Sequence, residues 1–426
     1  MTTALSQPIE SVDDVDLSDL DFWARPLPER DRAFALLRRD RPLAFYAEPD
    51  PPQDWIPVGP GYYAVTRYAD IEHVSRHPQI FSSAQGATSI NDMPPEFLEF
   101  FGSMINLDAP RHLRLRKIVS RAFSPRVVQR VEDDIAVVAA AIVDDIAPRG
   151  SCDFVPDVAA RLPLKVICNL MGIPEEEYDR VFRCSNVILG AGDPEYVPEG
   201  ADIVAALLGA GGELSELVQG LSRSRRERPT DDLISALANA EVDGERLTDA
   251  EIASFFILLA VAGNETTRNA IAYGLQLLTE NPDQRLIWQD DVEGVTPTAV
   301  DEIVRWASPV TWMRRTVTRD TELRGQQLKA GDKLLLFYNS GNRDEDPFTD
   351  PYAFDVRRSP NPHLGFGGTG PHFCLGAHLA RTEIGVIFRE LFRRLPDLHA
   401  VGEPQRLRSS FINGIKHLLC EFTPLR

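Results

Sequence analysis

Apolar residues along the chain follow two spacings, and each spacing predicts a different kind of element. Helical spacing of three and four runs through residues 28–39, 131–146, 162–171 and 201–226. Short runs rich in β-branched and aromatic residues lie at 62–66, 334–338 and 418–422. The pattern therefore predicts several helices, a small sheet near the N-terminus and further short strands.

The longest predicted helix opens at Thr248 and meets no stop signal before Asn281. An acid follows Thr248 at capping-box spacing, and at about 1.5 Å per residue such a helix spans roughly 50 Å. Midway, its apolar run ends in Ala-Gly-Asn-Glu-Thr-Thr at 262–267. An unpaired buried polar group costs on the order of 1 to 3 kcal/mol, so this interruption needs a reason. Either a kink is satisfied by threonine bonding to the preceding turn, or Ala262 and Gly263 let a flat ligand lie against the helix.

Two irregular stretches separate the predicted helices. Residues 82–107 include two prolines and more large apolar side chains than a solvated loop carries, so they predict a loop buried on the core or the roof of a pocket. Residues 187–194 break the helical pattern with two glycines and a proline. That break predicts either a lid hinge or a plain surface loop.

Composition narrows the class of protein. The chain has 426 residues, 43% of them hydrophobic, which is enough to bury a prosthetic group completely. A formal net charge of -19 argues against nucleic acid or an anionic membrane as the main partner. The longest apolar run, 255–263, is too short to span a bilayer, and the N-terminus is acidic where a signal peptide is basic. We therefore expect a cytoplasmic protein without a membrane span, with residues 1–20 as a flexible leader and 21–426 as a single domain.

One cysteine stands in an unusual setting. The five cysteines are scattered in the sequence, which argues against a disulfide framework or a zinc site. Cys374, however, ends a loop with four glycines at 366–376, and helical spacing begins directly after it. Backbone N–H groups and the positive end of a helix dipole favour a thiolate at that position. The alternative is a buried structural cysteine beside a turn.

The residues around this cysteine resemble the signature of the cytochrome P450 family. His372 two residues before the cysteine and Gly376 two after it match the family pattern, which implies that Cys374 is the axial thiolate of a haem iron. The usual aromatic residue lies seven positions before the cysteine, whereas Phe366 lies eight before it and Gly367 occupies the expected position. A subgroup of the family that hydroxylates branched lipids and sterol side chains has a loop that is longer by the same one residue. This departure from the usual spacing therefore makes the resemblance more specific to that subgroup.

Other motifs follow in the family's order. The resemblance implies that Glu265 and Thr266 form an acid-alcohol pair that relays protons, with Ala262 and Gly263 against the haem. It implies haem-propionate contacts from His112 and Arg116, which lie four residues apart on one helical face, and from Arg315, with which adjacent Arg314 is easily confused. Glu302, Arg305 and Arg358 resemble the family's structural ion-pair network, although acid and base three apart are also common on helix surfaces.

Taken together, the resemblance implies a haem-thiolate monooxygenase. The expected fold is mainly α with a small β-rich lobe, a triangular helical prism around a buried haem b. Electrons would come from a ferredoxin and its ferredoxin reductase, and the substrate would be the terminal methyl group of a methyl-branched lipid, isoprenoid or sterol side chain. Eight residues would line an apolar substrate channel, with core packing as the alternative: Ile90, Met93, Phe97, Met104, Leu259, Val310, Trp312 and Phe411.

Alternatives of other classes remain open from the sequence. A haem-thiolate peroxygenase or isomerase would not need the Glu265-Thr266 pair, a non-catalytic haem sensor would bind without turnover, and a monooxygenase could act on another secondary metabolite. The segment 111–130 carries seven Lys or Arg and no acid, which is a local positive field in an acidic protein. We expect that segment to help dock an acidic ferredoxin near Cys374, with Arg114, Lys117 and Arg121 facing it.

Overall fold

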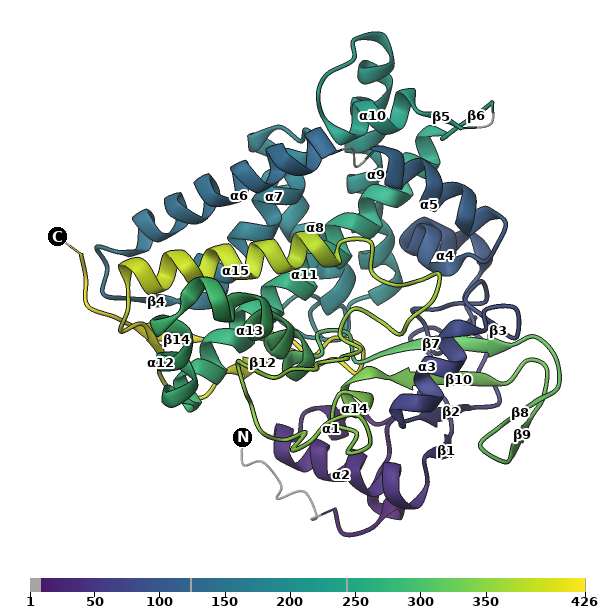
Figure 1. The fold of residues 1–426 in the computed structure, drawn as a ribbon. Coiled ribbons are helices and arrows are strands. Elements are labelled where there is room, and N and C mark those ends of the chain that lie inside the picture. Colours follow the sequence, from purple (N-terminus) through teal and green to yellow (C-terminus); the bar gives the residue numbers. More distant parts are fainter. Residues whose placement is uncertain (1–8, 123–124, 243, 426) are drawn as a thin grey trace.

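A computed structural model describes residues 9–122, 125–242 and 244–425, apart from the side chains of 121–130 and 242. The molecule has a roughly triangular outline, with helices over most of it and the largest sheet at one corner (Figure 1). The helices are α1 (Leu20–Trp23), α2 (Leu27–Asp40), α3 (Tyr68–Arg76), α4 (Pro95–Gly102), α5 (Arg111–Ala122), α6 (Pro125–Ile146), α7 (Arg161–Met171), α8 (Tyr178–Gly190), α9 (Ile203–Glu227), α10 (Leu233–Asn239), α11 (Asp249–Glu280), α12 (Pro282–Asp290), α13 (Val292–Ala307), α14 (Tyr338–Gly341) and α15 (Ala377–Arg394). Short 3₁₀ turns at Val12–Asp14, Ser103–Asn106 and Glu175–Glu177 and a π turn at Val155–Ala159 connect them.

The strands are short and form small sheets. They are β1 (Leu43–Tyr46), β2 (Tyr62–Val65), β3 (Phe81–Ser82), β4 (Ser151–Asp153), β5 (Glu241–Val242), β6 (Glu245–Arg246), β7 (Trp312–Val317), β8 (Thr321–Leu323), β9 (Gln326–Leu328), β10 (Lys333–Phe337), β11 (His399–Ala400), β12 (Gln405–Arg406), β13 (Ile415–His417) and β14 (Leu419–Glu421). The largest sheet has the order β1-β2-β10-β7-β3, in which β10 runs parallel to β2 and antiparallel to β7. This corner of the molecule therefore joins the N-terminal segment to strands about 250 residues later.

Helix α11 is the element on which the helical part is assembled. It runs for 32 residues, and both halves of the predicted capping box are present, Thr248 accepting from the Glu251 amide and Glu251 accepting from the Thr248 amide. It lies in the middle of the helical part (Figure 1) and packs against α9, α7, α8, α4 and α13. Its side chains are therefore buried on most of its circumference. The predicted helix is confirmed from cap to cap, with Asn281 at the C-terminal end.

The structure corrects two sequence expectations near the N-terminus. The predicted flexible leader covers 1–20, of which 1–8 lie outside the described residues. Residues 9–20 pack on the core, because Ile9, Val15 and Leu17 are buried in the same apolar cluster as α2, and the Trp23 indole N–H donates to the Leu17 carbonyl. A leader that carries few large apolar groups can still pack when each of them meets the core. Residues 82–107 are not wholly irregular either, since they contain α4.

Two further structural facts bear on the sequence analysis. The Cys152 and Cys420 thiols lie 3.4 Å apart on paired strands β4 and β14, so the tertiary structure brings together two cysteines that the sequence separates. Among the residues that the structure describes, no helix is both long and apolar enough to cross a bilayer.

Candidate active site

Cys374 lies at the end of a glycine-rich loop, two residues before Gly376, which caps α15. The loop closes on itself, because the Cys374 amide donates to the Phe366 carbonyl at 3.0 Å. Gly370 has a φ of 148°, and a Cβ there would lie 2.3 Å from the Ser75 carbonyl oxygen, so only glycine allows the loop to pass α3. The Cys374 residue is accessible to solvent. The surrounding protein withdraws the thiol from water and raises its pKa, and the Gly376 amide, Arg116 and Arg381 offset only part of that rise, so the pKa of Cys374 stays above its usual value.

Four side chains that can carry positive charge gather beside this loop. The rings of His112 and His372 have centroids 4.2 Å apart. Arg116 donates to the Phe373 carbonyl at 2.8 Å, and Arg315 donates to the Arg314 carbonyl at 2.7 Å. Burial and the charges of Arg315, His112 and Arg116 lower the pKa of His372 to about 2. None of the ion pairs that the described residues form involves Arg116 or Arg315, so this cluster is suited to an anion.

The cluster fits the cofactor that the sequence predicts. A haem carries two carboxylates on one edge, and two guanidinium groups without a carboxylate partner can each hold one of them. Burial lowers the pKa of Arg315, which is the response of a charged group that lacks a counter-ion. Arg314, by contrast, is bound to the Asp92 carboxylate at 2.6 Å and is therefore already neutralised. The two neighbours therefore differ: Arg314 has a carboxylate partner, and Arg315 takes part in none of the ion pairs that the described residues form.

The polar interruption in α11 presents one face to a cavity. Ala262 and Thr266, four residues apart, both line it, and the Thr266 hydroxyl donates to the Ala262 carbonyl at 2.6 Å. At Gly263 the structure shows a packing reason for glycine: a Cβ there would lie 2.6 Å from Cδ1 of Ile167 on α7. The missing side chain therefore allows α11 and α7 to pack closely, and the contact of Gly263 with a flat ligand stays a prediction.

Glu265 does not share the face of Thr266. Its side chain is 1% exposed and forms an ion pair with Arg268, which also donates to the Asn186 amide oxygen on α8 at 2.8 Å. Burial raises the pKa of Glu265 and the Arg268 charge lowers it, with a raised value as the result. One residue along a helix turns the side chain by about 100°, so the predicted acid-alcohol pair points in two directions here.

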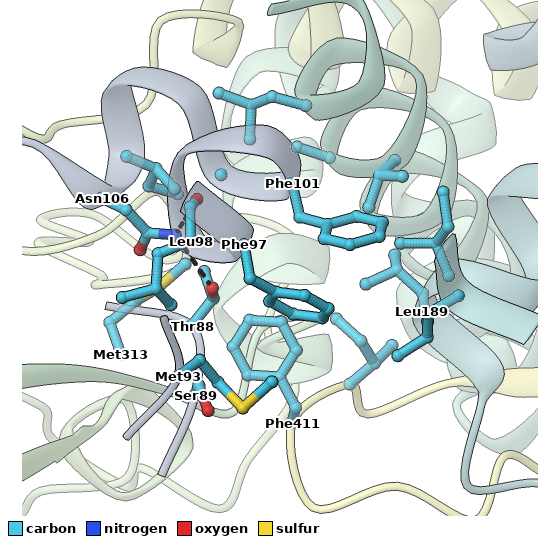
Figure 2. A pocket seen from close by; sticks show the side chains of 18 of the residues that line it. Thr88, Ser89, Met93, Phe97, Leu98, Phe101, Asn106, Leu189, Met313 and Phe411 are labelled. Carbon is cyan, nitrogen blue, oxygen red and sulfur yellow. Dashed lines mark hydrogen bonds between the residues drawn. The ribbon is translucent and has the colours of Figure 1, made fainter. Parts of the chain in front are cut away.

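The cavity beside Ala262 and Thr266 has a volume of about 330 Å³. Phe97 and Phe101 from α4 and Phe411 from the loop between β12 and β13 turn their rings into it, and Leu189 of α8 faces them (Figure 2). The Phe97 and Phe101 ring centroids are 4.7 Å apart. Of the predicted channel residues, the structure places four on the wall: Met93, Phe97, Val310 and Phe411.

The structure does not place the other four predicted channel residues on the wall of this cavity. Ile90 and Trp312 belong to the apolar cluster of α2 and the sheet, Met104 is buried in the main helical core, and half-buried Leu259 packs against that core. In each case a direct neighbour lines the cavity: Ser89 and Asn91, Met313, Ile105 and Leu258. Adjacent side chains point to opposite faces of a strand and about 100° apart on a helix, and both neighbours can be apolar. Hydrophobicity alone could not decide which of them faces the cavity.

Sequence reasoning also missed the contribution of α8 and α9. Ile188 and Leu189 near the end of α8 and Val204 and Leu207 near the start of α9 close the cavity on one side. The loop between these helices was predicted as a lid hinge or a plain loop. The signal was present in the apolar residues that flank the break, because such residues on both sides of a surface loop need something to cover.

The predicted structural network is confirmed and lies in the core. Arg305 and Glu302 are both fully buried and share two hydrogen bonds of 2.7 Å, and Arg358 donates to both Glu302 oxygens at 3.1 Å. Arg305 also donates to the Asn342 carbonyl, and the Asn342 side chain accepts from the Leu364 amide at 2.6 Å. The network therefore fixes the segment that leads into the Cys374 loop.

In the predicted basic docking segment 111–130, some of the positive charges are paired with acids. Arg114 forms ion pairs with Glu245 and Glu251, and Arg111 forms one with Glu99 at 2.6 Å. Acids from distant segments therefore reduce a positive field that is visible in the sequence. Lys117 is exposed, whereas the side chain of Arg121 lies outside the described residues.

Comparisons with known proteins agree with this geometry. The cytochrome P450 family model matches residues 212–396. The chain is 52% identical to the methyl-branched lipid omega-hydroxylase of Mycobacterium tuberculosis, over 96% of this chain and 95% of the relative. It is 44% identical to the steroid C26-monooxygenase of Mycolicibacterium smegmatis, over 85% of this chain and 84% of the relative.

The fold agrees as well. A Mycobacterium marinum cytochrome P450, solved in complex with pseudoionone, superposes with a TM-score of 0.91 at 44% identity and covers 98% of this chain and 100% of its own. The thiol beside a helix start, the cationic cluster without a counter-ion and an apolar cavity against the central helix are the parts such a protein needs. The chain therefore belongs to the cytochrome P450 family of haem-thiolate monooxygenases.

Proposed function

We propose that this monooxygenase hydroxylates the terminal methyl group of a methyl-branched lipid, an isoprenoid or a sterol side chain. The observation that carries the proposal is the cavity, whose wall is apolar apart from a few small polar side chains and which ends on Ala262 and Thr266 of α11. Such a wall suits a hydrocarbon chain and offers little to a polar substrate. Relatives named as methyl-branched lipid omega-hydroxylases and steroid C26-monooxygenases support the same substrate class.

The residues of the chain would divide the work as follows. Cys374 would hold the haem iron, and Arg116, His112 and Arg315 would hold the propionates, with His372 beside them. When bound, the haem supplies oxygen activation and the oxidation of the C–H bond. The protein supplies binding, orientation and exclusion of water.

Side chains would also have to deliver protons to the reaction. The Thr266 hydroxyl lies at the cavity and now donates to the Ala262 carbonyl, so turning that hydroxyl would offer its proton to a group in the cavity. Glu265 has a raised pKa and would replenish the proton, which requires its carboxyl to leave Arg268. We propose Thr266 as the donor at the cavity and Glu265 as the residue behind it.

The carbon atom at which the lipid is hydroxylated tests the proposed substrate class. A primary C–H bond is stronger than the tertiary bond beside it, so terminal hydroxylation requires walls that admit only the chain end. The haem-loaded enzyme, a surrogate ferredoxin with its reductase, and a methyl-branched lipid or isoprenoid should yield mainly the terminal alcohol, located by mass spectrometry of the derivatised product. Mainly tertiary or mid-chain alcohol would refute the proposal. Binding without turnover of any branched lipid would favour the haem sensor.

We also propose that electrons arrive from an acidic ferredoxin on the side of Cys374. Lys117 on α5 is exposed there, and Leu113 on the same helix is 54% exposed, as a docking surface requires. Lys117→Glu reverses the charge at this exposed position and should slow reduction at low salt. An unchanged reduction rate would place the docking surface elsewhere. A cytoplasmic location and a single functional domain over 21–426 are proposed on the same footing, from the sequence.

A further inference from the structure

The cavity wall contains no group that could receive a carboxylate. Its lining residues include no Lys, Arg or His. Its polar side chains are engaged within the protein: Asn106 donates to the Leu98 carbonyl at 2.8 Å and accepts from the Ala87 amide at 2.9 Å (Figure 2). Asn91 donates to Glu48 and to the Pro49 carbonyl. A negatively charged head group would therefore find no charged donor on this wall, only hydroxyls such as that of Thr88, to replace its water.

Two cations lie behind the wall, but both are neutralised. Arg314 follows the wall residue Met313 and binds the Asp92 carboxylate at 2.6 Å. Lys333 on the adjacent strand binds Glu48 at 2.6 Å and Asp92 at 3.0 Å. Arg314 and Lys333 are 1% and 2% exposed, so neither can turn toward the cavity without leaving its acid unpaired.

Three of the segments around the cavity are acidic. The segment that contributes Phe411 is basic, but its side chains are engaged: Lys416 pairs with Asp193 and Glu195, Arg408 pairs with Asp21, and Arg406 donates to the Tyr273 hydroxyl. The three acidic segments, 47–61, 84–107 and 187–210, contribute wall residues and contain ten Asp or Glu and no Lys, Arg or His. Pro52 in the first of them lines the cavity and is exposed, so the cavity reaches the surface at this rim. Five of the acids are exposed and take part in none of the ion pairs that the described residues form: Asp50, Asp54, Glu96, Glu199 and Asp202.

We infer that the enzyme selects lipids that carry no negative charge at the end remote from α11, such as alcohols, ketones and esters, over free fatty-acid anions. The inference rests on the proposed function, because it describes the substrate of the same cavity. With the methyl end at Thr266, the opposite end of a long lipid would lie at the rim. There an anion meets several like charges and no partner, whereas a neutral group meets only water and weak dipoles.

The salt dependence of lipid binding distinguishes charge repulsion at the rim from a difference in hydrophobicity between the lipids. For a head group placed about 12 Å from each of five like charges, Coulomb repulsion would weaken binding of an anion roughly fivefold to tenfold at about 10 mM salt, and by less than about twofold near 0.5 M. We would titrate the haem-loaded enzyme with one methyl-branched fatty acid, its methyl ester and its alcohol, and follow the haem spectrum. The acid should bind more weakly at low salt and approach the other two at high salt, while ester and alcohol change little.

A charge-neutral rim should remove the difference. In the quadruple variant Asp50→Asn, Asp54→Asn, Glu96→Gln and Glu199→Gln, the acid should gain most of its lost affinity at low salt. A matched control removes four exposed acids near the far end of α11 and on β14: Glu280→Gln, Asp283→Asn, Asp290→Asn and Glu421→Gln. That control has the same change of net charge and should leave the preference as it is.

The outcomes distinguish this inference from the proposed function. If the acid binds as tightly as its ester at low salt, or if added salt weakens it, the rim does not select against anions and the inference is overturned, while terminal hydroxylation can still be observed. If the control variant recovers acid binding as well as the rim variant, net charge alone is responsible and the inference also fails. If none of the three lipids is hydroxylated at its terminal methyl group, the proposed function falls and the inference with it.

Discussion

Replacing Gly263 with alanine tests whether this position serves packing or the ligand. The added Cβ would lie 2.6 Å from Cδ1 of Ile167, which is 2% exposed on α7. Alanine gains about 1 kcal/mol of helix propensity over glycine, whereas overpacking a core costs about 1 to 3 kcal/mol. Gly263→Ala should therefore be neutral or lose up to about 2 kcal/mol of unfolding free energy. Gly220 on α9, where a Cβ meets no atom within 4 Å, is the matched control and should gain from the same substitution.

A second substitution should recover the unfolding free energy that Gly263→Ala loses. Ile167→Val removes the clashing Cδ1 and by itself costs about 0.5 to 1.5 kcal/mol. If the two side chains compete for one space, the double variant should be more stable than the sum of the single effects by about 1 to 2 kcal/mol. With an unfolding entropy of about 2.1 cal/mol/K per residue, each kcal/mol shifts the thermal midpoint of a chain this long by about 1 °C.

The assay combines thermal midpoints of the four proteins of this cycle with their haem content and haem spectra. Packing predicts a coupled effect on the midpoint and nearly unchanged haem binding. If Gly263→Ala instead reduces haem content or alters the spectrum to the same degree with Ile167 and with Val at that position, the space belongs to the ligand. That result would refute the packing argument and restore the prediction made from the sequence.

Three further predictions concern the thiol, the proton donor and a surface histidine. Reduction under carbon monoxide should give the red-shifted Soret band of thiolate ligation, and Cys374→Ser should lose it; a parent protein without that band would contradict the ligand assignment. Thr266→Ala should leave haem and substrate binding nearly intact but divert reducing equivalents to peroxide, and unchanged coupling of electrons to product would rule out its role. Burial alone would lower the pKa of His417, but hydrogen bonds to Asp153 and Glu195 outweigh it and raise the pKa. The stabilisation is therefore full below about pH 6.5 and is lost as pH rises through the folded-state pKa, so the midpoint difference between parent and His417→Gln should shrink above neutral pH and should not grow.

Local sequence signals determined the central helix and the thiolate loop. Thr248 and its acid three residues later specify a helix start by bonds within one turn, and the glycines before Cys374 specify a tight loop by backbone sterics. The order of motifs likewise identified Glu302 and Arg305, because partners three apart on a helix meet in any fold. These features involve residues that are close in sequence, so the sequence alone was sufficient to predict them.

Tertiary structure decided which of two apolar neighbours faces the cavity. Leu258 and Leu259 are equally apolar, and Trp312 and Met313 are both large apolar residues, yet only Leu258 and Met313 line the cavity, while Leu259 packs against the helical core and Trp312 is buried beside α2. The free energy of burial is about the same on either side, so composition could not distinguish them. Only the rotation of each element against its neighbours could.

Charge was also settled by contacts between distant segments. Arg314 and Arg315 are the same residue type side by side, yet Asp92 neutralises the first, and the second takes part in none of the ion pairs that the described residues form. Arg268 beside Glu265 likewise reaches across to Asn186 on α8, a partner that lies 82 residues away in the sequence. Electrostatic interactions depend on distance in space, and the partner of a charged side chain can lie anywhere in the chain. The sequence therefore determined which residues could carry the chemistry, and the fold determined which of them face the site.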